Sequence, residues 1–324
     1  MQTPETDDSR DVKLTSVHKP VHYSMDISKY NTTVLIVALS KYSGLSPRLC
    51  EFLFSYFSEL EELFKADFHT LKKIDGLDET AAKKISTASQ HLDEAARFVD
   101  DLTKRNIRLI SRFDPTYPSL LFELNDPPTL LFLRGEMPAF DRKTVALIGT
   151  SEASNAGIEM TSRLAKTFSQ EGVQVVSSLY GGIDYAAHLG CKSAEGTSFA
   201  VIDGGFDSLA ADDSMPLAID IVKTGGIISE YPPDTKPTPD SYLQANRLLV
   251  GLVQAVVVTE LYRESFRTMD LLNFCSMIGK LVFFMVDPAT GAFADEESLS
   301  RAIDFGALPM VGYDKVTDII KALV

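Results

Sequence analysis

From residue 107 onward, the sequence alternates between short apolar runs and stretches whose apolar residues recur at helical spacing. The runs VALIG, AVVVT and LVFFMV are apolar throughout and do not alternate with polar residues. Such runs are typical of strands whose two faces are both covered, and strands that alternate with helices require crossover connections. The sequence therefore predicts a doubly wound α/β domain with a mostly parallel sheet.

The chain divides into three parts. Residues 1–32 are polar and mixed in charge, which predicts a flexible tail. Residues 33–106 carry apolar residues at helical spacing, as in LCEFLFSYFSELEELF, with hardly any glycine or proline. This pattern predicts a small all-helical domain. Residues 107–324 form the predicted α/β domain.

Composition restricts the functions open to such a chain. The net charge of -14 and pI near 4.8 argue against a protein that coats nucleic acid through its overall charge, because such binding needs a concentrated basic surface. A local basic patch stays open as an alternative. The three cysteines are Cys50, Cys191 and Cys275. Because none of them forms a C-x-x-C pair, we expect buried thiols and neither disulfides nor a zinc site. No signal-peptide core or membrane-length apolar stretch is present, so we expect a cytoplasmic protein without membrane contact.

Small and polar residues follow each predicted strand of the α/β domain. Because the carboxyl ends of parallel strands meet at one edge of a sheet, we expect these residues to converge on a binding crevice where the strand order reverses. They are Gly149, Thr150, Ser151, Gly182, Ile183, Asp184, Asp203, Gly204, Gly205, Glu230 and Glu260.

The loop GTSEASNAG, between the run VALIG and a helix, is typical of an anion site, and phosphate is the expected anion. Small residues let backbone N–H groups approach a ligand, and the helix directs its positive dipole end there. The alternative is that Gly149 and Gly157 only make a tight turn and let helix and strand pack closely. The loop matches neither G-x-G-x-x-G nor a P-loop, so neither a dinucleotide site nor a Walker-type site is expected.

The order of these segments resembles the DNA-processing protein A family, also called DprA or Smf. The resemblance covers roughly residue 107 to the C-terminus and rests on IGTSEAS, VVSSLYGGIDYAAH, FAVIDGGFD, GGIISEYPP, QANRLLVGLVQAVVVTE and GKLVFFMVDP. It implies an extended Rossmann-like domain that binds single-stranded DNA through its phosphates, forms a homodimer and brings RecA recombinase onto the strand. It implies no cofactor, no metal and no catalysis, and we expect no winged-helix domain after residue 324.

By position, the resemblance implies phosphate contacts from two loops and from an Asn-Arg pair. The residues concerned are Gly149, Thr150, Ser151, Ser154, Gly182, Ile183, Asp184, Asn246 and Arg247. Because NRLLVGL predicts a helix that begins there, the alternative is that Asn246 caps the helix and Arg247 pairs with Glu230 or Glu260. Asp184 is expected to cap a helix or fix its loop, with ligand contact as the alternative.

The sequence departs from the family pattern at two arginine positions. Ser151 stands where the family has the arginine of its Gly-Ser-Arg loop, and Gly181 stands where it has the arginine before Gly-Ile-Asp. Neither residue can make the bidentate, charge-assisted hydrogen bonds of a guanidinium with phosphate, so a lower affinity is expected. The candidates for compensating contacts are Lys192, Arg263 and Arg267.

Three titratable residues of the α/β domain are interpreted as structural. His188, flanked by Ala187 and Leu189 in a helix of small residues, is predicted to be a hydrogen-bonded packing histidine. Glu230 and Glu260 have no nucleophile or metal-ligand spacing beside them. We therefore expect them to orient arginines and not to act as an acid–base pair.

In the helical domain, LKKIDGLDETAAKKI, residues 71–85, has the pattern of a helix-hairpin-helix. In that motif, N–H groups around Gly76 face a DNA phosphate, and Lys83 and Lys84 add charge. The alternative, favoured by the acidic residues of the hairpin, is a sterile-alpha-motif-like bundle, as seen in the family. The core of that bundle would contain Ile74, Leu77, Ala81 and Ile85.

The leading hypothesis is a DprA-like protein that binds single-stranded DNA and delivers it to RecA in natural transformation without cutting it. Its binding is expected to be salt-sensitive and sequence-tolerant. The second hypothesis is a divergent member that has lost DNA loading and binds a nucleotide or a nucleotide-derived signal. A nucleotide phosphoribohydrolase ranks third, because the P-G-G-x-G-T-x-x-E signature of such enzymes is missing.

Overall fold

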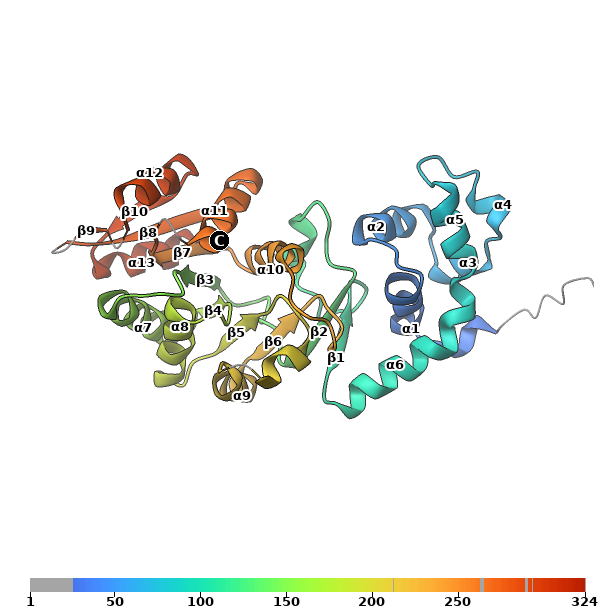
Figure 1. Cartoon of the computed structure of the whole chain (residues 1–324), viewed down its shortest axis with the longest axis horizontal. Coiled ribbons are helices and arrows are strands. Elements are labelled where there is room, and N and C mark those ends of the chain that lie inside the picture. Colours follow the sequence, from blue (N-terminus) through green and yellow to red (C-terminus); the bar gives the residue numbers. More distant parts are fainter. Residues whose placement is uncertain (1–25, 212, 263–264, 289–290, 293, 324) are drawn as a thin grey trace, which may run out of the picture.

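The described part of the chain begins with helices and continues as a large α/β structure (Figure 1). The computed structural model describes residues 26–211, 213–262, 265–288, 291–292 and 294–323. Most of the predicted tail, residues 1–25, therefore lies outside the described residues. The first described element is the short 3-10 helix η1 (Ile27–Lys29).

The N-terminal segment is all-helical because its apolar residues recur at helical spacing and short polar side chains cap its helices. Asn31, Ser46, Asp67 and Asp78 each accept a hydrogen bond from a backbone N–H of the turn that follows. The apolar faces of the helices pack into one core. The elements are α1 (Thr32–Val37), η2 (Ala38–Tyr42), α2 (Pro47–Tyr56), α3 (Leu60–Lys65), α4 (Phe68–Leu71), α5 (Glu79–Ser86), η3 (Ala88–His91) and α6 (Leu92–Lys104).

In the described part of the chain, ten strands form one sheet in the order β1-β2-β6-β5-β4-β3-β7-β8-β10, with β9 paired to β8. Strands β3 to β8 and β10 are parallel to one another, whereas β1, β2 and β9 add antiparallel pairs. The predicted mostly parallel sheet is confirmed. The strands are β1 (Arg108–Ser111), β2 (Leu130–Gly135), β3 (Thr144–Gly149), β4 (Gln174–Ser177), β5 (Ser198–Val201), β6 (Gly226–Ser229), β7 (Ala255–Glu260), β8 (Leu281–Asp287), β9 (Gly291–Ala292) and β10 (Leu308–Val311).

Strand β3 shows why these runs are apolar throughout. Val145 and Leu147 pack among helices α7, α8 and α13, whereas Ala146 and Ile148 pack on the other face with α10 and α11 (Figure 1). Successive side chains of a strand point to opposite faces, and helices cover both faces here. The helices are α7 (Asn155–Gln170), α8 (Gly182–Ser193), α9 (Met215–Thr224), α10 (Pro239–Gly251), α11 (Phe266–Ile278), α12 (Glu296–Asp304) and α13 (Val316–Ala322), with short 3-10 turns η4 (Ser119–Glu123), η5 (Phe206–Ala211) and η6 (Tyr313–Lys315).

The strand order reverses between β3 and β7. From β3 the sheet continues through β4 and β5 to β6, and the chain then returns to place β7 on the other side of β3. Doubly wound sheets bind ligands outside the carboxyl ends of their strands at such a reversal. The loops after β3, β4 and β7 start at this edge, so they are the loops that a ligand bound there would contact.

The structure also shows the state of the cysteines and the length of the apolar helices. Cys50, Cys191 and Cys275 are buried and free, as predicted. None of the helices within the described residues is both long enough and apolar enough to cross a membrane.

Candidate functional site

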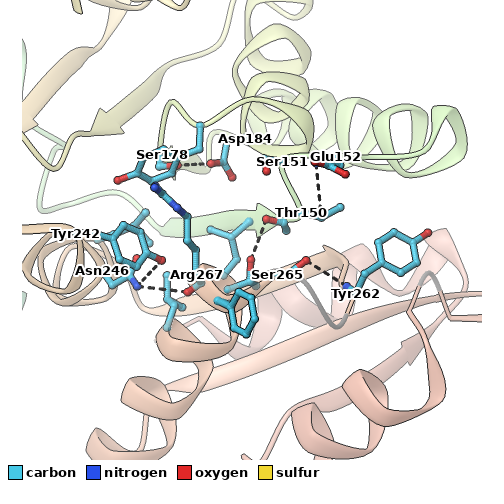
Figure 2. A pocket seen from close by; sticks show the side chains of 17 residues that line it. Thr150, Ser151, Glu152, Ser178, Asp184, Tyr242, Asn246, Tyr262, Ser265 and Arg267 are labelled. Atoms are coloured by element: carbon cyan, nitrogen blue, oxygen red, sulfur yellow. Dashed lines mark hydrogen bonds between the residues drawn. The ribbon is translucent and has the colours of Figure 1, made fainter. Parts of the chain in front are cut away.

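A pocket of about 310 Å³ lies at the carboxyl edge of the sheet, beside the reversal of strand order (Figure 2). Its wall comes from the loops after β3, β4 and β7 and from helices α10 and α11. Residues from distant parts of the chain therefore meet where the sequence predicts a crevice. The predicted site residues that line it are Gly149, Thr150, Ser151, Asp184, Asn246 and Arg267.

The N-terminus of α7, where a phosphate was predicted, holds a carboxylate of the protein itself. The Ser154 N–H donates to the two carboxylate oxygens of Glu260 at 3.2 and 3.0 Å, and the Tyr262 hydroxyl donates to Glu260 Oε1 at 2.6 Å. Ser154 Oγ accepts from the Gly157 N–H at 3.0 Å and so caps the helix. Glu260 therefore occupies the anion position and, against expectation, contacts no arginine among the residues that the structure describes.

The glycines of the β3–α7 loop are explained by close packing, which was the alternative interpretation. A Cβ on Gly157 would lie 2.0 Å from Glu260 Oε2, and a Cβ on Gly149 would lie 2.6 Å from the Glu260 carbonyl oxygen. The loop after β4 packs equally closely, because a Cβ on Gly182 would lie 2.4 Å from the Thr150 carbonyl oxygen. The Ile183 N–H donates to that same oxygen at 3.1 Å. Gly182 and Ile183 thus hold the two loops together behind the pocket wall.

Asp184 and His188 have structural roles in α8. Asp184 is buried and accepts a hydrogen bond from the Ser178 hydroxyl, so it fixes the loop after β4, as one interpretation predicted. Burial raises the pKa of Asp184 to about 6, although hydrogen bonds from Ser178 and the Tyr180 N–H favour its ionised form. His188 lies within hydrogen-bond distance of Ser198 Oγ at 3.0 Å and the Ser178 carbonyl oxygen at 2.9 Å, and burial lowers its pKa to about 4. It is the packing histidine that the sequence predicts.

Helix α10 begins earlier than the sequence pattern predicts. Its first residue is Pro239, and the Thr238 side chain accepts a hydrogen bond from the first turn. Asn246 therefore lies in the interior of the helix and does not cap it. Its side-chain amide donates to the Tyr242 hydroxyl at 2.7 Å and to the Arg267 carbonyl oxygen at 3.4 Å, which ties α10 to α11.

Arg247 does not reach the pocket, which corrects its predicted place there. Its side chain is 7% exposed, and its guanidinium donates to Glu230 Oε1 at 2.5 Å and to Gln244 Oε1 at 2.8 Å. It also contacts Asp126, with 3.2 Å between Nη1 and Oδ1. This is the ion pair with Glu230 that was the alternative to a phosphate contact.

Among the described residues, the cation that lines the pocket is Arg267. Its guanidinium carbon lies 3.9 Å from the centroid of the Tyr180 ring and 4.5 Å from that of the Tyr242 ring. Figure 2 shows the side chain extending from α11 across the pocket toward Ser178. Stacking engages the faces of the guanidinium, and none of its N–H groups has a hydrogen-bond or ion-pair partner within the described residues. These donors are available to a ligand.

Of the other two compensating candidates, the structure describes only Lys192. Lys192 lines a separate cavity and donates to Asp220 Oδ2 at 2.6 Å. Arg263 lies outside the described residues.

The helical hairpin has the buried core predicted for a bundle. Gly76 is exposed with φ +90°, Lys83 is exposed, and Lys84 Nζ lies 3.4 Å from the Gly44 carbonyl oxygen. The core positions of the bundle are all buried, namely Ile74, Leu77, Ala81 and Ile85. A DNA contact by this hairpin stays a prediction.

Four aromatic residues of the pocket were not predicted, namely Tyr180, Tyr242, Tyr262 and Phe266. Tyr180 interrupts a run of small residues, VVSSLYGG, at the end of a strand, and a large ring in such a run is a signal that could have identified it. Tyr242 and Phe266 carry no comparable signal, because aromatic residues on helices are usually core residues. Their place at the pocket follows from tertiary structure.

Known proteins share both the sequence pattern and this fold. The model of the family described as DNA recombination-mediator protein A matches residues 108–321. The chain belongs to this family. Protein Smf of Synechocystis sp. is 29% identical over 228 residues, which are 69% of this chain and 57% of that protein. DNA processing protein DprA of Bacillus subtilis is 29% identical over 181 residues, 56% of this chain and 61% of that protein. The chain thus spans about three fifths of the length of these relatives.

Solved structures of DNA processing protein A share the fold. The X-ray structure from Streptococcus pneumoniae has a TM-score of 0.73 at 24% identity and covers 91% of this chain and 99% of that chain. A Helicobacter pylori structure, described by its single-stranded DNA binding mode, has a TM-score of 0.58 at 20% identity and covers 67% of this chain and 97% of that chain. The first match extends beyond the sheet into the N-terminal helices.

In this member of the family, the two positions expected to carry arginine lie together at the pocket. Ser151 lines it, and a Cβ on Gly181 would lie 3.8 Å from the Ser151 carbonyl oxygen. Arg267 enters from α11, on a different part of the wall. The pocket thus retains a guanidinium, but from another element of the fold.

Proposed function

We propose that this protein binds single-stranded DNA in the pocket and that Arg267 contacts a backbone phosphate. The observation that carries the proposal is the guanidinium stacked on Tyr180 and Tyr242, whose N–H groups have no partner within the described residues. Stacking holds the group in one plane, and a planar guanidinium matches the geometry of phosphate oxygens. The Helicobacter pylori relative, whose structure addresses its single-stranded DNA binding mode, supports the same ligand class.

The finer role rests on family membership. The protein delivers the bound strand to RecA recombinase in natural transformation, acts as a homodimer in the cytoplasm and does not cut the strand. Support for binding without catalysis comes from Glu230 and Glu260, because each carboxylate is engaged in structural contacts and does not line the pocket.

The size of the pocket favours a second candidate, the binding of a nucleotide or a nucleotide-derived signal. A volume of about 310 Å³ is at the lower end of the range for small-molecule sites. The loss of arginine at Ser151 and Gly181 leaves fewer cations for a long anionic strand than the family pattern provides. This candidate predicts tight binding of a mononucleotide without DNA affinity.

Fluorescence anisotropy with labelled single-stranded DNA, double-stranded DNA and a mononucleotide tests the proposal. We expect single-stranded DNA to bind most tightly and the logarithm of its affinity to fall with the logarithm of salt concentration, by about 0.7 per phosphate contacted. Salt-insensitive binding would rule out phosphate contact. Binding of the mononucleotide alone would favour the second candidate.

The affinity for single-stranded DNA should also rise, about threefold, as the pH falls from about 7 to 5. Asp184 lines the pocket with Arg267, and burial raises its pKa to about 6, so it takes up a proton in this range. Loss of this negative charge favours a phosphate, whose own charge does not change. Asp184→Asn should bind with a flat pH profile between the same limits, and a wild-type profile as flat as that of the variant would contradict the prediction.

A further inference from the structure

An exposed aromatic ring stands at the same pocket as the free guanidinium. Phe266 is the first residue of α11, lines the pocket and is 73% exposed. Single exposed apolar residues are common on protein surfaces and need no explanation by themselves. Phe266 differs because the next residue, Arg267, supplies a cation to that pocket.

Other aromatic side chains of the pocket already have partners within the protein. The rings of Tyr180 and Tyr242 are covered by the guanidinium of Arg267, at 3.9 and 4.5 Å. The Tyr262 hydroxyl is held by Glu260. Among the described residues, no ring or cation stacks on Phe266. It is therefore an aromatic surface at the pocket that a planar ligand can cover.

We propose that Phe266 stacks on one unpaired base of the DNA strand while Arg267 binds an adjacent phosphate. This inference rests on the proposed function and deepens it by naming which parts of the nucleotide are recognised. Every base has a π face, so stacking tolerates any sequence. A base inside a duplex has both faces covered by its neighbours. The ring therefore selects single strands, a discrimination that phosphate contacts alone do not provide.

A tryptophan at position 266 makes the stacking directly observable. The chain contains no tryptophan, so Phe266→Trp introduces a single fluorophore. We expect its emission to be quenched by an oligothymidine and not by an abasic oligonucleotide of equal length, which has the same phosphates but no bases. Unchanged emission with the oligothymidine bound, as seen by anisotropy of a label on the DNA, would overturn the inference.

Removing the Phe266 ring should weaken the contact with a base and leave the contact with phosphate intact. We expect Phe266→Ala to weaken binding of the oligothymidine about tenfold and to leave binding of the abasic oligonucleotide unchanged. Phe140→Ala is the matched control, because Phe140 is 84% exposed and lies outside the pocket wall. Thermal unfolding checks that each variant is folded, and neither substitution removes a buried side chain.

The outcomes distinguish this inference from the function on which it rests. If Phe266→Ala binds both oligonucleotides as the wild type does, or loses affinity for both equally, Phe266 does not stack on a base. If the wild type binds both equally tightly, phosphate binding stands and the stacking inference fails. If the wild type binds neither, the proposed function fails and the inference fails with it.

Discussion

Arg267→Gln is expected to weaken the binding of single-stranded DNA about 30-fold. A charge-assisted hydrogen bond to phosphate contributes about 2 kcal/mol, and glutamine keeps polar reach while removing the charge. The salt dependence should change as well, with the slope of log affinity against log salt becoming shallower by about 0.7 for the lost phosphate contact. Anisotropy titrations at several salt concentrations measure both effects.

Arg163 provides the matched control for this substitution. It is an exposed arginine on α7 whose guanidinium carbon lies 3.8 Å from the centroid of the Tyr313 ring, outside the pocket wall. Arg163→Gln removes the same charge and the same kind of stacking, so general electrostatic effects should appear in both variants. Equal losses in the two variants would mean that Arg267 contacts no phosphate, and the proposed function would lose its main support.

Arg247→Met should lower the free energy of unfolding by about 3 kcal/mol, because it leaves the buried Glu230 carboxylate without its partner. Urea unfolding monitored by circular dichroism measures this loss. Burial already raises the pKa of Glu230 to about 7, and removing the guanidinium raises it further. A raised carboxyl pKa favours the folded state at low pH, so the destabilisation should be smaller at pH 5 than at pH 8.

The double variant Arg247→Met with Glu230→Met should recover most of the lost stability, because apolar residues that replace a whole buried ion pair are often tolerated. DNA binding provides the discriminating readout. In conditions where Arg247→Met is folded, its affinity for single-stranded DNA should equal that of the wild type. A loss of DNA affinity without a loss of stability would place Arg247 back in the binding site.

Apolar patterning predicts the central sheet well and its additions poorly. VALIG is apolar because both faces of β3 are covered, and this is a local signal. The antiparallel strands β1 and β2 were not predicted, because RLIS has only two apolar residues and LLFLRG is held by pairing with β6, a contact distant in sequence. The start of α10 was missed although Thr238 and Pro239 are typical of a helix N-cap and first turn.

The sequence locates the binding edge of the sheet but does not identify its cation. Asn246 lines the pocket, whereas Arg247, the next residue on α10, points to Glu230. Consecutive residues of a helix are about 100° apart around its axis, so neighbouring side chains point in different directions. Because the sequence pattern placed the start of the helix at Asn246, it could not predict which of these two side chains faces the pocket. Whether Lys192 or Arg267 reaches the pocket depends on how α8 and α11 pack on the sheet, and no local pattern records this.

The carboxylate of Glu260 at the start of α7 has a consequence for how a strand is held. It neutralises the fixed positive potential that the backbone of this helix would otherwise offer. Contact with the proposed DNA ligand then depends on side chains, which change rotamer within nanoseconds, while the scaffold stays still. Under the proposed function, nucleotides can then be released one after another without any rearrangement of the sheet.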